Sequence, residues 1–299
     1  MAGGLLVTGR ARSRIGGTMD GAGRRNHARK MTQHNKTYLT RGRALLAVSL
    51  FAIISVFVFV EPYPQPQAYH AFADDRSLLG IANFWNVATN TVFLVPGIAG
   101  LWMLGSRDHA GIVSGLFPAY HILFVGVLLT AFGSGWFHLA PDNDTLFWDR
   151  LPMTVAFMSL VAIIVGEHVS ENLGRRLLWP LLAIGGGSVF YWDYSESQHA
   201  GDLRLYGLVQ FLPMLLIPAI MLMYQSVFDR TRFIWVAFLL YALAKVFEQL
   251  DMAIYGFGEI ISGHSIKHVC AALGSVVLIY GGSKRQLRQS TNEGVNNAE

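Results

Sequence analysis

Five polar residues stand at chemically useful spacings in an otherwise apolar chain. Ser134 and His138 lie four residues apart in GSGWFHLAPDNDTLFWDRLPM, residues 133–153, and Asp149 follows in the same stretch. His264 and His268 are also four residues apart, in SGHSIKHVCAALG, residues 262–274. This spacing places two side chains on one face of a helix. The C-terminal pair of histidines could therefore reach a single metal ion.

Together, these residue types could form the site of a metal-dependent hydrolase. Three neutral imidazoles with one open coordination position are typical of catalytic zinc, which lowers the pKa of bound water to about 7. Asp149 could then act as general base and acid, and Ser134 could hydrogen-bond the water or the developing oxyanion. Simpler explanations remain open. The histidines could bond to backbone or water, and Asp149 could stabilise the start of a helix through the helix dipole.

Composition indicates that the elements positioning these residues are membrane-spanning helices. Of 299 residues, 53% are hydrophobic and 14% are charged, whereas a soluble domain has roughly 25% charged residues. Eight segments have about the 20 apolar residues needed to cross a bilayer; they lie near residues 44–60, 84–104, 111–137, 150–166, 177–192, 207–225, 233–250 and 264–281. The fifth segment is the weakest, because it contains Pro180 and three glycines. We therefore predict an all-α polytopic membrane protein.

The charges between the segments predict how the chain is oriented. The leader before the first segment carries ten Lys and Arg residues against one acid, Asp20, and basic segments of this kind stay in the cytoplasm. With eight spans, the basic or balanced connections fall on that side and the mainly acidic ones on the other. We predict cytoplasmic N- and C-termini and, in a bacterium, an inner-membrane protein. His138, Asp149, His264 and His268 then share the non-cytoplasmic side, which favours one common metal site.

Other classes of protein are excluded by what the sequence lacks. Cys270 is the only cysteine, so neither an intrachain disulfide nor a thiolate zinc site can form. The sequence has no glycine-rich phosphate loop and no GxSxG pattern. The net charge of +4 reflects membrane topology, because no basic patch interleaved with aromatic residues indicates nucleic-acid binding. The expected partners are the bilayer and a membrane lipid.

Further polar residues are assigned to structure. Lys245 and Glu248 lie three residues apart in the seventh segment and are expected to neutralise each other. Lys245 could also carry a retinal Schiff base, but a photoreceptor would leave the three histidines without a role. The Asn and Thr side chains of FWNVATNTVF, residues 84–93, are expected to form hydrogen bonds between helices.

Three stretches of the sequence resemble the alkaline ceramidases. IANFWNVATNTVFLVPGIAGLW, residues 81–102, is similar to the first core helix of that family. Residues 133–153 resemble its Ser-x-x-x-His segment and the acid before Leu-Pro-Met, and residues 262–274 resemble the His-x-x-x-His of its last helix. The likeness covers about residues 80–281. It extends more loosely to the superfamily of seven-helix membrane hydrolases that includes the adiponectin receptors.

The resemblance implies a role for each candidate residue. His138, His264 and His268 fall on the zinc ligands of the family, Ser134 on the serine beside the zinc-bound water, and Asp149 on the catalytic acid. The implied reaction is hydrolysis of the amide of ceramide, or of a related N-acyl lipid, to a sphingoid base and a fatty acid. Two alternatives stay open: a hydrolase of another membrane lipid, and a receptor or transporter with structural zinc. Retention of Ser134 and Asp149 favours the enzyme, because structural zinc needs neither.

The resemblance also suggests the domain organisation and one departure. We expect a basic, disordered cytoplasmic leader (1–42), an additional transmembrane helix (43–62), a seven-helix catalytic core (80–281) and a polar cytoplasmic tail (282–299). Eukaryotic relatives bind calcium through an acidic segment that ends in a Glu, where this chain has Asn83. Asp74 and Asp75 are candidate calcium ligands here, although two acids in a loop are more often simply solvated.

Overall fold

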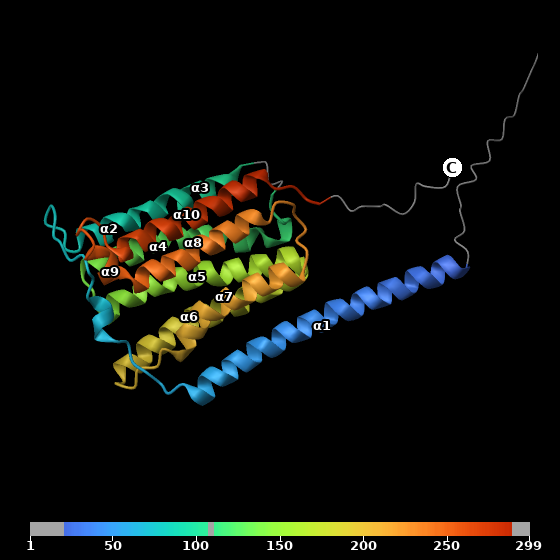
Figure 1. Ribbon diagram of the computed structural model, residues 1–299, viewed down its shortest axis with the longest axis horizontal. Helices are drawn as coiled ribbons and strands as arrows, with labels where there is room; N and C mark the ends of the chain where they lie inside the picture. The colour runs from blue at the N-terminus through green and yellow to red at the C-terminus, as the bar shows by residue number, and fades with distance from the viewer. Residues whose placement is uncertain (1–20, 107–110, 289–299) are drawn as a thin grey trace, which may run out of the picture. The chain divides into compact units, whose positions relative to one another are not determined.

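The computed structural model describes residues 21–106 and 111–288, which fold into α-helices and short 3-10 turns without a named β-strand (Figure 1). The α-helices are α1 (Gly21–Phe59), α2 (Phe84–Asn90), α3 (Leu94–Gly105), α4 (Phe117–Leu139), α5 (Asn143–His168), α6 (Glu171–Ser197), α7 (Arg204–Met223), α8 (Arg232–Gln249), α9 (Asp251–Tyr255) and α10 (Gly263–Lys284). The 3-10 turns are η1 (Gln67–His70), η2 (Thr91–Phe93) and η3 (Ser114–Leu116). The all-α fold predicted from the sequence is therefore confirmed.

Six helical segments of the described chain are long and apolar enough to cross a membrane. They are Lys36–Phe59, Phe84–Gly105, Ser114–Leu139, Asn143–His168, Arg204–Met223 and Gly263–Lys284. The other two predicted spans, α6 and α8, are helices of 27 and 18 residues, but they are more polar. In α8 the charges are Arg232, Lys245 and Glu248. The protein is thus a polytopic membrane protein, and α8 contributes the half-buried charges of Lys245 and Glu248 to the bundle.

Helix α1 begins earlier than the sequence suggested. It starts at Gly21, inside the leader for which no regular structure was expected. Residues 28–31, Ala-Arg-Lys-Met, are all strong helix formers. Extending an existing helix costs far less than nucleating a new one, so the apolar span can carry the helix back into this polar stretch. Residues 1–20 of the expected leader and residues 289–299 of the expected tail lie outside the described residues.

Small residues allow α4 and α5 to pack closely. A Cβ atom at Gly133 would lie 2.0 Å from the carbonyl oxygen of Trp148, and one at Gly126 would lie 2.9 Å from the backbone nitrogen of Ala156. Membrane helices commonly approach through such positions, where the absence of a side chain brings two backbones together. The contact at Gly133 brings the end of α4, which carries Ser134 and His138, against the first turns of α5.

The start of α10 is held against α8 in a similar way. A Cβ atom at Gly263 would lie 2.2 Å from the carbonyl oxygen of Phe247. Ser262 caps the helix, because its hydroxyl accepts a hydrogen bond from the backbone N–H of Ser265 at 3.1 Å. α10 also packs on α2 and α3, and α2 and α9 lie at the same end of the bundle (Figure 1). These contacts fix the position of His264 along the axis of the bundle.

The turn between α4 and α5 is fixed by a capping box. Helix α4 ends at Leu139, just before Pro141 and Asp142. Asp142 caps α5 by accepting a hydrogen bond from the N–H of Thr145 at 2.7 Å. Because α5 begins at Asn143 rather than near residue 150, Asp149 lies beyond the first turn of the helix. The helix dipole therefore does not explain Asp149.

Candidate functional site

The structure brings the three candidate histidines together. His138 comes from the last turn of α4, and His264 and His268 come from the first turns of α10. Their possible ligand atoms all lie within 4.8 Å of one another, and all three side chains are buried. The Nε2 atoms of His138 and His264 are 3.3 Å apart. The sequence thus identified three residues that converge, although His138 and His264 are 126 positions apart.

The environment of His268 prepares one ring nitrogen for a metal. The hydroxyl of Thr89, on α2, donates its hydrogen to the carbonyl of Trp85 at 2.7 Å. A hydroxyl has one hydrogen, so with that hydrogen on the Trp85 carbonyl, Nδ1–H of His268 donates to the Thr89 oxygen, 2.9 Å away. Nε2 of His268 then keeps its lone pair, and this buried atom has no hydrogen-bond partner among the described residues. A histidine fixed through its other nitrogen is typical of metal ligands.

The donor set as a whole fits a metal ion. Buried polar atoms without partners cost free energy, and Nε2 of His268 has none among the described residues, while Nε2 of His138 and Nε2 of His264 face each other at 3.3 Å. Three imidazole nitrogens are the ligands that zinc prefers in catalytic sites. A cation held between the three rings would satisfy Nε2 of His268 and could accept the lone pairs of the two facing Nε2 atoms. The cluster can therefore hold a metal, and the nature of its ligands is compatible with zinc.

Ser134 and Asp149 border the histidine cluster. Ser134 lies one turn before His138 on the same face of α4, and its side chain is within hydrogen-bonding reach of Asp149. Both side chains are buried. A carboxylate and a hydroxyl thus sit beside three possible metal ligands in a region shielded from solvent. The structure places together all five residues that the sequence singled out.

Hydrogen bonds from neighbouring segments fix the frame of the site. Asp251 accepts hydrogen bonds from the backbone N–H of His264 at 2.7 Å and from that of Ala73 at 3.0 Å. Asn83 donates to the carbonyl of His138 at 2.9 Å. The ring of Phe72 covers His138 and His264, with centroid distances of 4.6 and 4.9 Å. The segment before α2 therefore closes one side of the cluster.

A charge network lies next to the histidines. Lys245 forms the expected ion pair with Glu248. Lys267, which precedes His268, also binds this carboxylate, at 2.7 Å. The hydroxyl of Tyr69 lies 3.5 Å from Glu248. Glu248 therefore bridges α8 and α10, and the sequence missed Lys267 because this contact depends on how the two helices pack.

Of the two candidate calcium ligands, the buried Asp74 is already paired with an arginine. The carboxylate of Asp74 accepts two hydrogen bonds from Arg76, from Nε at 2.8 Å and from Nη2 at 2.6 Å. Asp74 is buried, while Asp75 is exposed. Calcium needs six to eight oxygen ligands, and the Arg76 guanidinium occupies both oxygens of the buried carboxylate. These residues do not fit a calcium site.

An apolar cavity begins close to the histidines. It has a volume of about 170 Å³ and lies between α4, α5, α7, α8 and α10. Phe93 lines it, and the Phe93 ring is 6.3 Å from the ring of His268. Thr130 and Ala271, each about one turn from a candidate site residue, also line it. The cavity can therefore accept a hydrocarbon chain whose end lies at the site.

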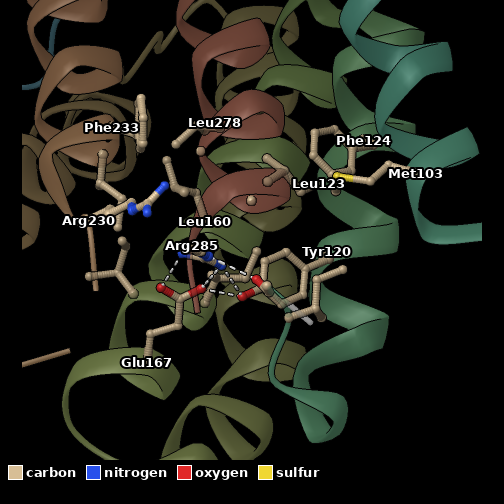
Figure 2. A pocket seen from close by; sticks show the side chains of 17 residues that line it. Met103, Tyr120, Leu123, Phe124, Leu160, Glu167, Arg230, Phe233, Leu278 and Arg285 are labelled. Atoms are coloured by element: carbon tan, nitrogen blue, oxygen red, sulfur yellow. Dashed lines mark hydrogen bonds and ion pairs between the residues drawn. The ribbon is translucent and has the colours of Figure 1, made fainter. Parts of the chain in front are cut away.

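A second charged cluster lies at the opposite end of the bundle. Figure 2 shows Arg285, just after α10, binding Glu167 near the end of α5 and Tyr120 near the start of α4. Arg285 Nη1 lies 2.8 Å from Glu167, and Nη2 lies 2.9 Å from the Tyr120 hydroxyl. Tyr120 also donates to Glu167. All of these groups are paired with each other, so this cluster stabilises the helix ends and is separate from the histidine site.

Fold and site define a polytopic all-α membrane protein with a buried three-histidine cluster able to hold a metal. A comparison with protein families matches residues 78–296, which contain the whole site, to the family described as Ceramidase. A search of curated proteins gave no match. The chain belongs to the ceramidase family, whose members are metal-dependent membrane hydrolases of the ceramide amide bond. The resemblance noted in the sequence is confirmed.

Proposed function

We propose that this ceramidase-family protein is a zinc-dependent amidase that cleaves ceramide, or a related N-acyl lipid, to a sphingoid base and a fatty acid. The observation that carries the proposal is the convergence of His138, His264 and His268 beside Ser134 and Asp149. The histidines would hold the zinc ion. When bound, zinc would supply Lewis-acid polarisation of the lipid carbonyl and lower the pKa of water to about 7.

Asp149 and Ser134 are proposed to move and hold the protons of the reaction. Asp149 accepts a proton from the attacking water as the new C–O bond forms, and returns it to the amide nitrogen as the C–N bond breaks. The Ser134 hydroxyl donates a hydrogen bond to the water or to the developing oxyanion. Burial of both residues excludes bulk water, which strengthens these interactions. The products are an amine and a carboxylic acid.

The apolar cavity is proposed to hold one chain of the lipid. Residues of α7 and α8 line it. These two helices pack little on each other, because α8 packs mainly on α10. A lipid can therefore reach the cavity laterally from the bilayer. Its amide would lie at the histidines and its chain would extend along Thr130 and Ala271 toward the bilayer centre. Burial of each methylene contributes roughly 0.8 kcal/mol, which favours long-chain substrates.

The same proposal includes the arrangement of the chain in the membrane. The basic leader and the tail would be cytoplasmic, and the site would face the opposite side, because the basic connections are on the leader's side. The proposed domain organisation is the one expected from the sequence: a leader (1–42), an additional transmembrane helix (43–62), the catalytic core (80–281) and a polar tail (282–299). Cysteine labelling of single-cysteine variants in spheroplasts would test this orientation. Labelling of position 144 only from the outside would support it.

Product analysis tests the proposed reaction. Detergent-purified protein is incubated with C18 ceramide and with the corresponding ester analogue, and both products are measured by mass spectrometry. We expect sphingoid base and fatty acid from ceramide, and no release by His138→Ala. Release from the ester alone would shift the substrate to another lipid class. Release from neither lipid, with the metal present, would contradict the proposed function.

A further inference from the structure

Arg150 is a buried cation with unused hydrogen-bond donors. It follows Asp149 on α5, and only 4% of its surface is exposed. The guanidinium carbon lies 4.1 Å from the ring centre of Trp192 and 4.3 Å from that of Tyr206. Nη2 donates to the side-chain oxygen of Gln65 at 2.5 Å. Nε and Nη1 are buried and have no hydrogen-bond partner among the described residues.

The other buried or partly buried arginines of the described chain show what Arg150 lacks. Arg285 is paired with Glu167 (Figure 2), Arg204 with Asp202, and Arg76 with Asp74. Arg150 forms no ion pair with a described carboxylate, although Asp149 precedes it in sequence. A buried charge without a partner is costly. The neutral oxygen of Gln65 is a weak substitute for an anion.

The position of Arg150 connects it to the candidate active site. The ring centre of Tyr69 lies 5.8 Å from the Arg150 guanidinium. The same ring stacks on Phe137 at 6.3 Å, and Phe137 directly precedes His138. One aromatic ring therefore separates the guanidinium from the residues around the histidine cluster. A ligand that extends past Tyr69 could contact both regions.

Gln65 occupies a position from which it can be displaced. It lies between α1 and η1, outside any helix, and its backbone N–H donates to Glu196 at 2.5 Å, so the side chain can turn away while the backbone stays in place. Its side-chain amide makes one other hydrogen bond, to the carbonyl of Pro66 at 3.4 Å. Trp192 and Tyr206 would continue to fix the plane of the guanidinium. An arginine held in this way presents parallel N–H groups that match a carboxylate or a phosphate.

We propose that Arg150 binds an anionic oxygen group, a carboxylate or a phosphate, carried by the lipid substrate near its amide, and that Gln65 fills this position in the ligand-free protein. This inference rests on the proposed amidase function. It names the preferred substrate class as anionic N-acyl lipids, in which two oxygens accept from the guanidinium. A neutral ceramide offers no such group and leaves the donors of Arg150 unpaired.

Competition between substrates tests this assignment. Neutral C18 ceramide, C18 ceramide 1-phosphate and N-stearoylglycine are compared by kcat/KM, with wild type, Arg150→Met, Arg150→Lys and the control Arg175→Met. Arg175 is an exposed residue of α6, so its substitution should leave the ratios at their wild-type values. We expect wild type to prefer at least one anionic lipid by about tenfold or more, since a site built for a polar group rejects ligands that lack it.

The variants separate recognition from a structural role. In Arg150→Met the anionic-to-neutral ratio of kcat/KM should fall to about one, because KM for the anionic lipid rises while kcat stays the same. In Arg150→Lys this ratio should recover in part. Equal kcat/KM for anionic and neutral lipids in wild type would overturn the inference. Inhibition by inorganic phosphate without any preference among the lipids would also overturn it, because the anion would then not belong to the substrate.

The inference can fail independently of the proposed function. Hydrolysis of neutral ceramide with no preference for anionic lipids would leave the amidase intact and remove the role of Arg150. If no lipid is hydrolysed, the anion site can still be tested by lipid binding. A rise in the melting temperature of wild type with N-stearoylglycine, absent in Arg150→Met, supports the anion site. No rise with either anionic lipid contradicts it.

Discussion

The Thr89 hydroxyl and Nδ1 of His268 are 2.9 Å apart, and this contact sets which nitrogen of His268 faces the cluster. Thr89 is on α2 and His268 on α10, so the contact also ties together the first and last helices of the family match. Because Thr89 donates its own hydrogen to a backbone carbonyl, the imidazole is held with its Nε2 lone pair free. Thr89 would therefore act on a bound metal through His268.

Replacing Thr89 by Val should weaken metal binding without unfolding the protein. The change removes the acceptor for Nδ1–H and leaves the ring free to rotate or change tautomer. Loss of such a partner typically costs 10- to 100-fold in metal affinity or activity. Zinc affinity measured by competition with a chelator checks this, and Thr91→Val is the control. Thr91 is exposed and bonds only the Ala88 carbonyl in the described structure; equal affinities for both variants would contradict the role of Thr89.

The Asp149→Asn variant should retain the metal but lose most of its turnover. The amide has nearly the same shape but cannot accept a proton from water, so kcat should fall about 10²- to 10⁴-fold. Asp144→Asn is a matched control, because Asp144 lies in the first turn of the same helix and is exposed. Metal content and turnover are measured on the same samples. Wild-type turnover by Asp149→Asn would show that another group transfers the proton.

Calcium should leave both stability and activity unchanged. The Arg76 guanidinium already neutralises Asp74 and also donates to the carbonyl of Ile260 at 2.9 Å. A ligand at 100 times its Kd would add about 2.7 kcal/mol to stability, which a melting curve with millimolar calcium would detect. We expect no shift in wild type or Asp75→Asn, and a lower melting temperature for Arg76→Met even without calcium. A calcium-dependent rise in the melting temperature of wild type would contradict the view that the pairing of Arg76 with Asp74 prevents calcium binding.

Asp142 should make the protein sensitive to acid. The hydrogen bond from the backbone N–H of Thr145, and then the one from its hydroxyl, hold the pKa of Asp142 below its usual value. Its stabilising effect is therefore complete above the unfolded pKa of about 3.9 and is lost as the pH falls through the lower folded pKa. The cap contributes on the order of 1 kcal/mol.

A comparison of Asp142→Asn and Asp142→Ala isolates that effect. Asparagine still caps a helix but does not titrate, so Asp142→Asn should be less acid-sensitive than wild type between about pH 5 and 3. Asp142→Ala should be less stable at pH 7. Melting temperature in detergent at each pH is the measurement. Identical acid profiles for wild type and Asp142→Asn would exclude Asp142 as the titrating group.

Local spacing explains why the sequence identified the main site residues. His264 and His268 share a helix face at any packing of α10, and Ser134 and His138 do the same on α4. The end of α4 just before Pro141 also agrees with residue type, because proline seldom continues a helix. The start of α5 did not follow from residue type, because Thr145 and Leu146 lie in a polar stretch whose helical state depends on the cap at Asp142.

Contacts between distant segments explain what the sequence could not reveal. Thr89 was assigned a hydrogen bond between helices, but its partner, 179 residues away, could not be identified without the packing of α2 on α10. No sequence motif or residue spacing marked Lys267 or Arg150 as a functional candidate. The role of each depends on a neighbour from another helix, Glu248 and Trp192 respectively. Residue spacing predicts helix faces, whereas tertiary packing decides which faces meet.

The central claim is that His138, His264 and His268 hold one catalytic zinc. The most direct measurement is metal content by mass spectrometry, paired with ceramide hydrolysis, on detergent-purified wild type and His264→Ala. His121→Ala is the control, because His121 lies on α4 but outside the cluster. We predict about one zinc per chain with turnover in wild type and in the control, and the loss of both in His264→Ala. Wild-type protein that turns over ceramide without bound metal, or His264→Ala protein that keeps both, would contradict the account.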